Sequence, residues 1–170
     1  MVLLVQYTLI FASVLALVAL GGCFSEHSGV INIGLEGIMV MGALGGALAM
    51  KFLPATTPGI VLFILIVLAS VVVGMVFSLL LGFAAIHFNA DQTLVGTALN
   101  LMGTAAAVVI VRAINVAENP DNVSSTVVYR QAKQVFLVKI GDFEFNWFML
   151  IIVLAIIASH IVLYRTKFGL

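Results

Sequence analysis

The residues IVLFILIVLASVVVGMVFSLLLGFAAI, at positions 60–86, lie within a stretch from Phe52 to Ala90 that contains no Asp, Glu, Lys or Arg. A helix needs about 20 mostly apolar residues to cross the hydrocarbon core of a bilayer. The quoted run exceeds that minimum, so it predicts one long or tilted transmembrane helix. The fold class is therefore that of a membrane protein.

The composition of the whole chain leads to the same class. Apolar residues make up 64% of the 170 residues and charged residues only 8%, against roughly 25% charged residues in typical soluble domains. A soluble protein could not hide this much apolar surface from water. The formal net charge is zero, so no bulk field favours a nucleic acid polymer as partner. Cys23 is the single cysteine, which excludes an internal disulfide.

The scarce charges divide the rest of the chain into further apolar segments. Together they predict an all-α, polytopic membrane protein with about five transmembrane helices and one extracytoplasmic loop. Eight of the fourteen charged residues fall in that loop, 112–146, where short alternating patterns on either side of Gly141 indicate a hairpin or a surface-lying segment. The predicted spans lie near 2–22, 29–50, 59–87, 93–111 and 147–164.

The orientation follows from the basic residues next to the last span. Arg165 and Lys167 form its cationic flank, and cytoplasmic flanks are enriched in Lys and Arg. We therefore expect the C-terminal end in the cytoplasm. Five crossings then place the N-terminus and the loop 112–146 outside.

The second predicted span carries small residues and one carboxylate. Gly42 and Gly46 form a GxxxG pair at which another helix backbone can approach closely. Asn32 and Glu36 are one helical turn apart and share a face. Since a carboxylate within a span is costly, Glu36 is either part of a polar pathway or a residue near a helix end, bonded to neighbouring backbone or hydrated. The sequence leaves both readings open.

The fourth predicted span has a continuous polar face flanked by two small residues, Gly96 and Gly103, which we assign to helix packing. An amide exposed to lipid is unfavourable, so this face should turn inward. Hydroxyl and amide groups suit a pathway for a neutral polar solute; the alternative is hydrogen bonding between helices as packing. The face consists of Thr93, Thr97, Asn100 and Thr104.

Motifs for other kinds of chemistry are missing from the sequence. His27, His87 and His160 are isolated, with no second ligand at metal-binding spacing. The chain has no assembled catalytic set and no GxxxxGK[ST] phosphate loop. We therefore expect no metal, no cofactor and no enzymatic activity in this chain. Any driven transport must take its energy from another chain.

Two blocks resemble a known family. The stretch GGCFSEHSGVINIGLEGIM (21–39) closely resembles a signature of bacterial ABC-importer permeases of the branched-chain amino acid/ribose type. The match is closest to the nucleoside, guanosine-type branch of that family. The stretch DQTLVGTALNL (91–101) resembles a second block of the same permeases, and the ending YRTKFGL (164–170) resembles the start of their cytoplasmic coupling loop.

The resemblance implies partners and a length. Such permeases pair with a second permease subunit and a cytoplasmic ATPase, and they receive solute from an extracytoplasmic binding lipoprotein. Arg165, Lys167 and Gly169 would then begin the coupling loop. Members of the family are about twice as long, so the chain is expected to be the N-terminal half of a transmembrane permease domain.

The functional expectation is a permease subunit that moves nucleosides or a similar neutral solute across the bacterial cell membrane. A sugar or branched-chain amino acid permease of the same superfamily is one alternative, and a structural membrane subunit that carries no solute is another. The candidates for the solute pathway are Asn32, Glu36, Gln92, Thr93, Thr97, Asn100 and Thr104.

Overall fold

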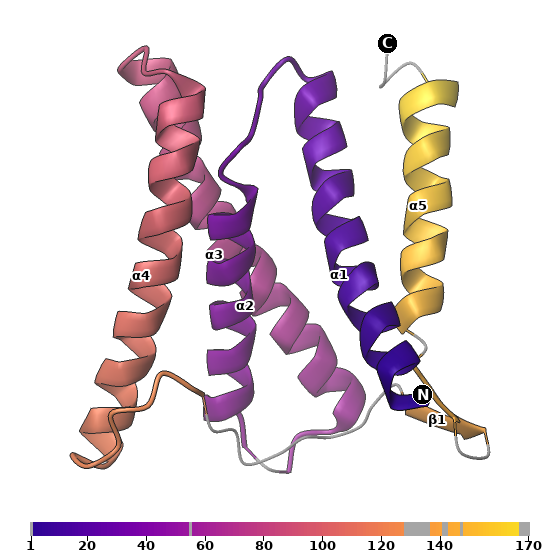
Figure 1. Cartoon of the computed structure of the whole chain (residues 1–170), viewed down its shortest axis with the longest axis vertical. Coiled ribbons are helices and arrows are strands. Elements are labelled where there is room, and N and C mark those ends of the chain that lie inside the picture. The colour runs from indigo at the N-terminus through magenta and orange to yellow at the C-terminus, as the bar shows by residue number, and fades with distance from the viewer. Residues whose placement is uncertain (1, 55, 128–136, 141–142, 147, 167–170) are drawn as a thin grey trace. The chain divides into compact units, whose positions relative to one another are not determined.

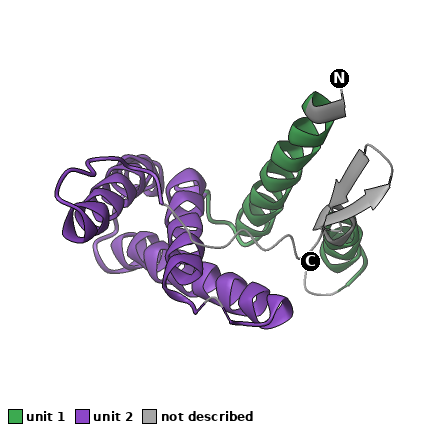
Figure 2. Cartoon of the chain, turned by 90° about the horizontal axis from the view of Figure 1, so that it is seen from below, with its two compact units in different colours: residues 1–31, 134–170 green, residues 32–133 purple. Residues whose placement is uncertain are grey.

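The computed structural model of the chain describes residues 2–54, 56–127, 137–140, 143–146 and 148–166. The chain divides into two compact units, which Figure 2 colours separately. The first comprises residues 1–31 and 134–170, and the second comprises residues 32–133.

The described residues form helices and one short hairpin (Figure 1). Among these residues, four helices are long and apolar enough to cross a membrane. A fifth helix contains the shorter apolar segment Ile152–Arg165. The prediction of a helical, polytopic membrane protein is confirmed. The helices are α1 (Val2–His27), α2 (Leu35–Phe52), α3 (Gly59–His87), α4 (Gln92–Glu118) and α5 (Phe148–Arg165).

The first unit holds α1, α5 and the hairpin. Strand β1 (Leu137–Ile140) pairs antiparallel with β2 (Phe143–Asn146), with Val138 opposite Phe145. Gly141, between these strands, lies outside the described residues. Helices α1 and α5 contact each other, and the rings of His27 and Tyr164 meet edge to face with centroids 5.8 Å apart.

Helix α1 ends in a turn at Gly29, just after the polar residues Ser25, Glu26 and His27 of its last turn. Gly29 has φ +80, a left-handed conformation that glycine adopts without steric cost. Its N–H donates to the carbonyl of Glu26 (2.9 Å), and the N–H of Val30 donates to the carbonyl of Ser25 (3.2 Å). This pair of bonds is the Schellman motif, which satisfies the last carbonyls of a helix.

The second unit is a bundle of α2, α3 and α4, each packed against the other two (Figure 1). Its core contains the buried side chains of Phe77, Leu81 and Leu99, with Ile38 and Met41 among the partly buried side chains around them. Helices α2 and α4 run parallel because α3 returns the chain between them. The start of α2 therefore lies beside the first half of α4, and the end of α2 lies beside the end of α4. The candidate site is at the first of these two contacts.

The helix bounds differ from the predicted spans at three places. Helix α1 continues past residue 22, the predicted end of the first span, to His27. Residues 29–34 precede α2, which begins at Leu35, because the turn at Gly29 and a contact to α4 described below take this segment out of the helix. Helix α4 continues past Val111 to Glu118, so residues 112–118 belong to a helix and not to the loop. Charges at a membrane boundary end a span without ending the helix.

Candidate functional site

The start of α2 lies against the first half of α4 with almost no space between the two backbones. A Cβ built at Gly37 would lie 2.5 Å from the carbonyl oxygen of Leu99, and one at Gly103 would lie 2.9 Å from the Cα of Gly37. A Cβ at Gly96 would lie 2.9 Å from the backbone nitrogen of Gly34. Real Cβ atoms do not approach backbone this closely, so these positions require glycine for packing.

Asn100 uses this close approach to bind the backbone of the α2 segment. The N–H of Gly37 donates to its Oδ1 (2.7 Å), and its Nδ2 donates to the carbonyl oxygen of Ile33 (2.8 Å). Both ends of the amide are therefore engaged by residues more than sixty positions away in the chain.

The other predicted residues of α4 differ from Asn100. Thr93, Thr97 and Thr104 are exposed, and the hydroxyls of Thr97 and Thr104 donate to carbonyls of their own helix at 2.8 and 3.0 Å. Gln92 is half-buried at the first position of α4. The threonines thus present a polar face on the described surface of the second unit, with lone pairs still able to accept hydrogen bonds.

The structure separates Asn32 from Glu36. Asn32 lies in the segment before α2, and its Oδ1 is buried without a hydrogen-bond partner. That oxygen lies 3.3 Å from the Cβ position of Gly34, which in turn approaches Gly96. Glu36 lies in the first turn of α2 and is exposed, where a carboxylate is favoured by the helix dipole. Asn32 therefore lies close to the Asn100 contact, whereas the side chain of Glu36 is exposed on the first turn of α2.

The GxxxG pair of α2 lies against α3. A Cβ at Gly42 would lie 3.3 Å from the carbonyl oxygen of Ser70, and one at Gly46 would collide with the hydroxyl of Ser70. Gly74 of α3 is opposite Gly42. Small residues thus set the distance of α2 from α3 as well as from α4.

A polar cluster at the far end of α2 and α4 was not predicted. Asn115 is 2% exposed, and its Nδ2 donates to the carbonyl oxygens of Ser124 (3.0 Å) and Thr126 (2.9 Å). Lys51 forms an ion pair with Glu118 (3.0 Å) and donates to Asn115 Oδ1 at 3.4 Å. The signal in the sequence was Asn115 and Glu118 one turn apart, together with the one cation that ends α2.

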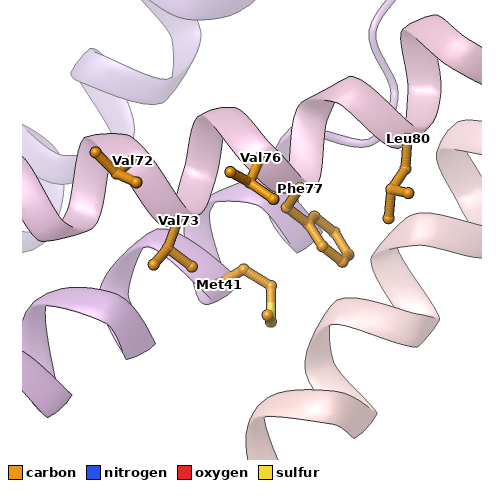
Figure 3. Close-up of a pocket in the computed structure, with 6 residues that line it drawn as sticks. All are labelled: Met41, Val72, Val73, Val76, Phe77 and Leu80. Carbon is orange, nitrogen blue, oxygen red and sulfur yellow. The ribbon is translucent and has the colours of Figure 1, made fainter.

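An apolar pocket of about 240 Å³ opens on the second unit, and Figure 3 shows its side chains. A nucleoside or sugar placed there would leave its hydroxyl and amide groups without partners, which is costly. The pocket is therefore unsuited to a polar solute. It is lined by Met41 of α2 and by Val72, Val73, Val76, Phe77 and Leu80 of α3.

The isolated histidines and the residues assigned to the start of the coupling loop lie in the first unit or near helix ends. His160 packs against Tyr164, and His87 stacks on Phe83. The described residues contain no group of three or more His, Cys, Asp or Glu side chains placed to hold a metal ion. Arg165 ends α5, whereas Lys167 and Gly169 lie outside the described residues.

Comparison with known proteins identifies the family. A family model described as "Branched-chain amino acid transport system / permease component" matches residues 4–170. The chain belongs to this permease family. The resemblance seen in the sequence blocks is thereby confirmed, and the apolar helices are those of a multi-pass protein of the bacterial cell membrane.

Two relatives of this permease chain match nearly all of it. The guanosine ABC transporter permease protein NupQ of Bacillus subtilis is 36% identical over 176 residues, which cover 99% of this chain and 54% of the relative. The nucleoside ABC transporter permease protein NupC of Lactococcus lactis is 32% identical over 173 residues, with the same two shares. The chain thus spans about half the length of these curated relatives.

A third relative matches a shorter part. The putative glucose ABC transporter permease protein TsgC13 of Haloferax volcanii is 36% identical over 101 residues, which cover 59% of this chain and 29% of the relative. No solved structure matches the chain.

Proposed function

We propose that the chain forms part of the permease subunit of an ABC importer that moves nucleosides, or a similar neutral polar solute, into the cytoplasm. The observation that carries the proposal is the similarity over 99% of the chain to two relatives that are named as guanosine and nucleoside permeases. The family membership supports the transport role, and these relatives favour nucleosides as the solute class.

The polar face of α4 supports a route for such a solute. Thr93, Thr97 and Thr104 are exposed and uncharged, and neutral hydroxyls exchange hydrogen bonds with the ribose hydroxyls and base edges of a nucleoside. Asn32, Glu36 and Gln92 lie toward the same ends of α2 and α4 and belong to the proposed route. A charged wall would bind an ionic solute, whereas this face favours a neutral one.

We further propose that ATP is hydrolysed on a separate cytoplasmic chain. The permease then pairs with a second permease subunit and with that ATPase, and it receives solute from an extracytoplasmic binding lipoprotein. Arg165, Lys167 and Gly169 begin the loop that transmits closure of the ATPase to the helices. The transmitted motion alternates the route between outward-open and inward-open states.

Uptake of labelled guanosine tests the function. The gene is deleted in its host and restored on a plasmid, and uptake is compared with that of an unrelated amino acid as the control. We expect deletion to lower guanosine uptake at least tenfold and the plasmid to restore it. Unlabelled nucleosides should compete with the labelled solute, whereas glucose and leucine should not. Unchanged guanosine uptake after deletion would contradict the proposal.

A sugar permease is a second candidate, because one relative is named as a putative glucose permease and hydroxyl groups suit sugars equally well. The same assay separates the two, since loss of glucose uptake with intact guanosine uptake would favour the sugar. A branched-chain amino acid permease is tested by leucine uptake in the same way. Loss of none of these activities would favour a structural subunit that carries no solute.

The proposed orientation places residues 119–146 outside the cell, next to the binding protein. Labelling of a cysteine introduced at Asn122 tests it, in a background where the exposed Cys23 is replaced by serine. A membrane-impermeant maleimide should label the cysteine in intact cells. Labelling only after the cells are opened would reverse the topology.

A further inference from the structure

Helix α2 begins without a capping side chain of its own. Its N-cap residue is Gly34, with φ −73 and ψ 7 and no side-chain hydrogen bond. The first N–H groups of a helix have no partner within the helix, and an acceptor side chain at the N-cap normally takes one of them at the second or third position. Gly37 is the third residue of α2 and is buried, so its N–H has little access to water as a hydrogen-bond acceptor.

Asn100 supplies that acceptor from another helix. Its Oδ1 accepts from the N–H of Gly37 at 2.7 Å, which is the bond that an Asn at the N-cap makes in an ordinary helix. Helix α4, in contrast, is capped by its own N-cap residue, since Asp91 Oδ1 accepts from the N–H of Thr93 at 2.7 Å. The two parallel helices therefore start in different ways, one with a local cap and one with a cap from its neighbour.

The same amide also holds the segment before the helix. Its Nδ2 donates to the carbonyl of Ile33 at 2.8 Å, so one side chain binds the backbone on both sides of Gly34. This needs a donor and an acceptor on the same planar group, at the reach of a short side chain. The reach is sufficient because Gly37 and Gly103 bring the two backbones into contact.

We propose that Asn100 is a positioning residue that caps α2 from α4 and fixes where the route begins. The bend before α2 carries Asn32, and the first turn carries Glu36. Asn100 sets the place of both relative to the exposed threonines of α4, and it does so through backbone bonds and not by touching the solute. Its bearing on transport rests on the proposed function, whereas the capping itself does not.

The substitution Asn100→Asp tests the two-sided bond by pH. A protonated carboxyl accepts from Gly37 and donates to Ile33 as the amide does, whereas a carboxylate only accepts and faces the carbonyl of Ile33 with a second lone-pair oxygen. Asn100→Leu loses both bonds at every pH. The stabilising effect of the Asp side chain should therefore appear as the pH falls and the carboxyl takes up its proton.

Other groups titrate on the elements packed together here, so each variant is compared with the unchanged protein at the same pH. Glu36 lies next to Gly37, so its negative charge would repel a carboxylate at position 100. This repulsion destabilises the ionised Asp variant, as the loss of the hydrogen-bond donor does. The ionisable side chains of the three packed helices are Glu36 and Lys51 on α2, His87 on α3, and Arg112 and Glu118 on α4, with Asp91 at the N-cap of α4.

The measurement is the melting temperature of the purified protein in detergent at about pH 4 and about pH 8. We expect Asn100→Leu to melt about 2–6 °C lower at both values. Asn100→Asp should match that loss at about pH 8 and recover at least half of it at about pH 4. Asn122→Asp is the matched control, because Asn122 is half-buried like Asn100 but its Oδ1 only accepts from the N–H of Ser124; it should melt like the unchanged protein at both values.

Two outcomes overturn the capping: equal melting of the Asp and Leu variants at both pH values, or recovery of the Asp variant on raising the pH. Uptake measurements separate the positioning role from solute contact. If Asn100 positions the route, the variants that melt at a lower temperature should also have a lower maximal uptake rate per folded protein, while their KM stays unchanged. A KM raised more than about threefold at unchanged melting temperature would make Asn100 a solute ligand. If guanosine uptake proves unrelated to this chain, the melting experiment still decides the capping.

Discussion

Helices α2 and α4 are joined at both ends, but by opposite means. At one end glycines bring the backbones into contact and Asn100 binds the backbone of the α2 segment directly. At the other end side chains make the contact, since Lys51 pairs with Glu118 and donates to Asn115. An asparagine of α4 is central to both. The difference shows that an amide side chain can hold two helices together in two ways. It can cap backbone groups of the other helix, or it can form hydrogen bonds with side chains and with a loop.

The two ends should respond differently to substitution. At the glycine end, space limits which side chains are tolerated, because any added side chain would collide with backbone atoms of the other helix. The polar end is limited by pairing, because its buried groups need partners while its outer side chains reach water. Substitutions at Gly37, at Asn115 and at the Lys51–Glu118 ion pair test this contrast.

The largest effect is expected for Gly37→Leu. A Cβ there would lie 2.5 Å from the carbonyl oxygen of Leu99, so α2 must move away from α4 and both Asn100 bonds break. We expect a loss of at least about 3 kcal/mol of folding free energy. In practice, little monodisperse protein should be recovered by size-exclusion chromatography in detergent.

Gly82→Leu is the matched control, because Gly82 lies inside α3 and a Cβ built there meets no atom within 4 Å. It should give protein at the level of the unchanged chain. Equal recovery of the two variants would show that the close approach at Gly37 does not hold the bundle together.

The sequence predicted the parts of this arrangement that a bilayer dictates. Charges are excluded from hydrocarbon, so their spacing located the helices, and the family resemblance rested on consecutive residues such as 21–39. The gap between the first two predicted spans, residues 23–28, contains the end of α1, which Gly29 terminates by a local mechanism. Signals that act within a few residues can be read from one sequence.

The partners of Asn100 and Lys51 could not be predicted in the same way. Asn100 finds Ile33 and Gly37 only because glycines on two helices happen to meet, and that distance depends on packing. Lys51 finds Glu118 because α3 returns the chain and aligns α2 with α4. In the sequence, Lys51 directly follows the second predicted span, whereas Glu118 falls in the predicted loop 112–146. Contacts between distant segments require the fold before they can be assigned.

An intermediate effect is expected for Asn115→Leu. The new side chain has a similar branched shape but no donor, so the carbonyls of Ser124 and Thr126 lose their partner. Unpaired buried polar groups cost about 1–3 kcal/mol, and residues 119–127 should detach from α4. Hydrogen exchange of the amides in this segment should accelerate at least tenfold, while the amides at the start of α2 keep their rates.

Asn119→Ala provides the comparison at the same loop, because Asn119 is exposed and its Oδ1 accepts only from the N–H of Asp121. Exchange in the Asn119 variant should change less than threefold away from Asp121. If Asn115→Leu left exchange in residues 119–127 unchanged, the loop would be held by other contacts.

The smallest effects are expected at the ion pair, and there the order of two substitutions is informative. Lys51→Met leaves Glu118, whose side chain is 57% exposed and stays hydrated, and it removes a long 3.4 Å bond to Asn115. Its cost should stay below about 1 kcal/mol, as for exposed pairs.

Glu118→Ala leaves the ammonium of Lys51 on a side chain only 9% exposed, without that partner. Because an uncompensated charge with little access to water is costlier than a hydrated one, the Glu118 variant should melt below the Lys51 variant. The double variant should melt close to Lys51→Met, since the charge that suffers from the loss of Glu118 is then absent. The opposite order would mean that Lys51 is well hydrated in the membrane-bound protein, and the polar end would then be a surface contact and not a buried counterpart of the glycine end.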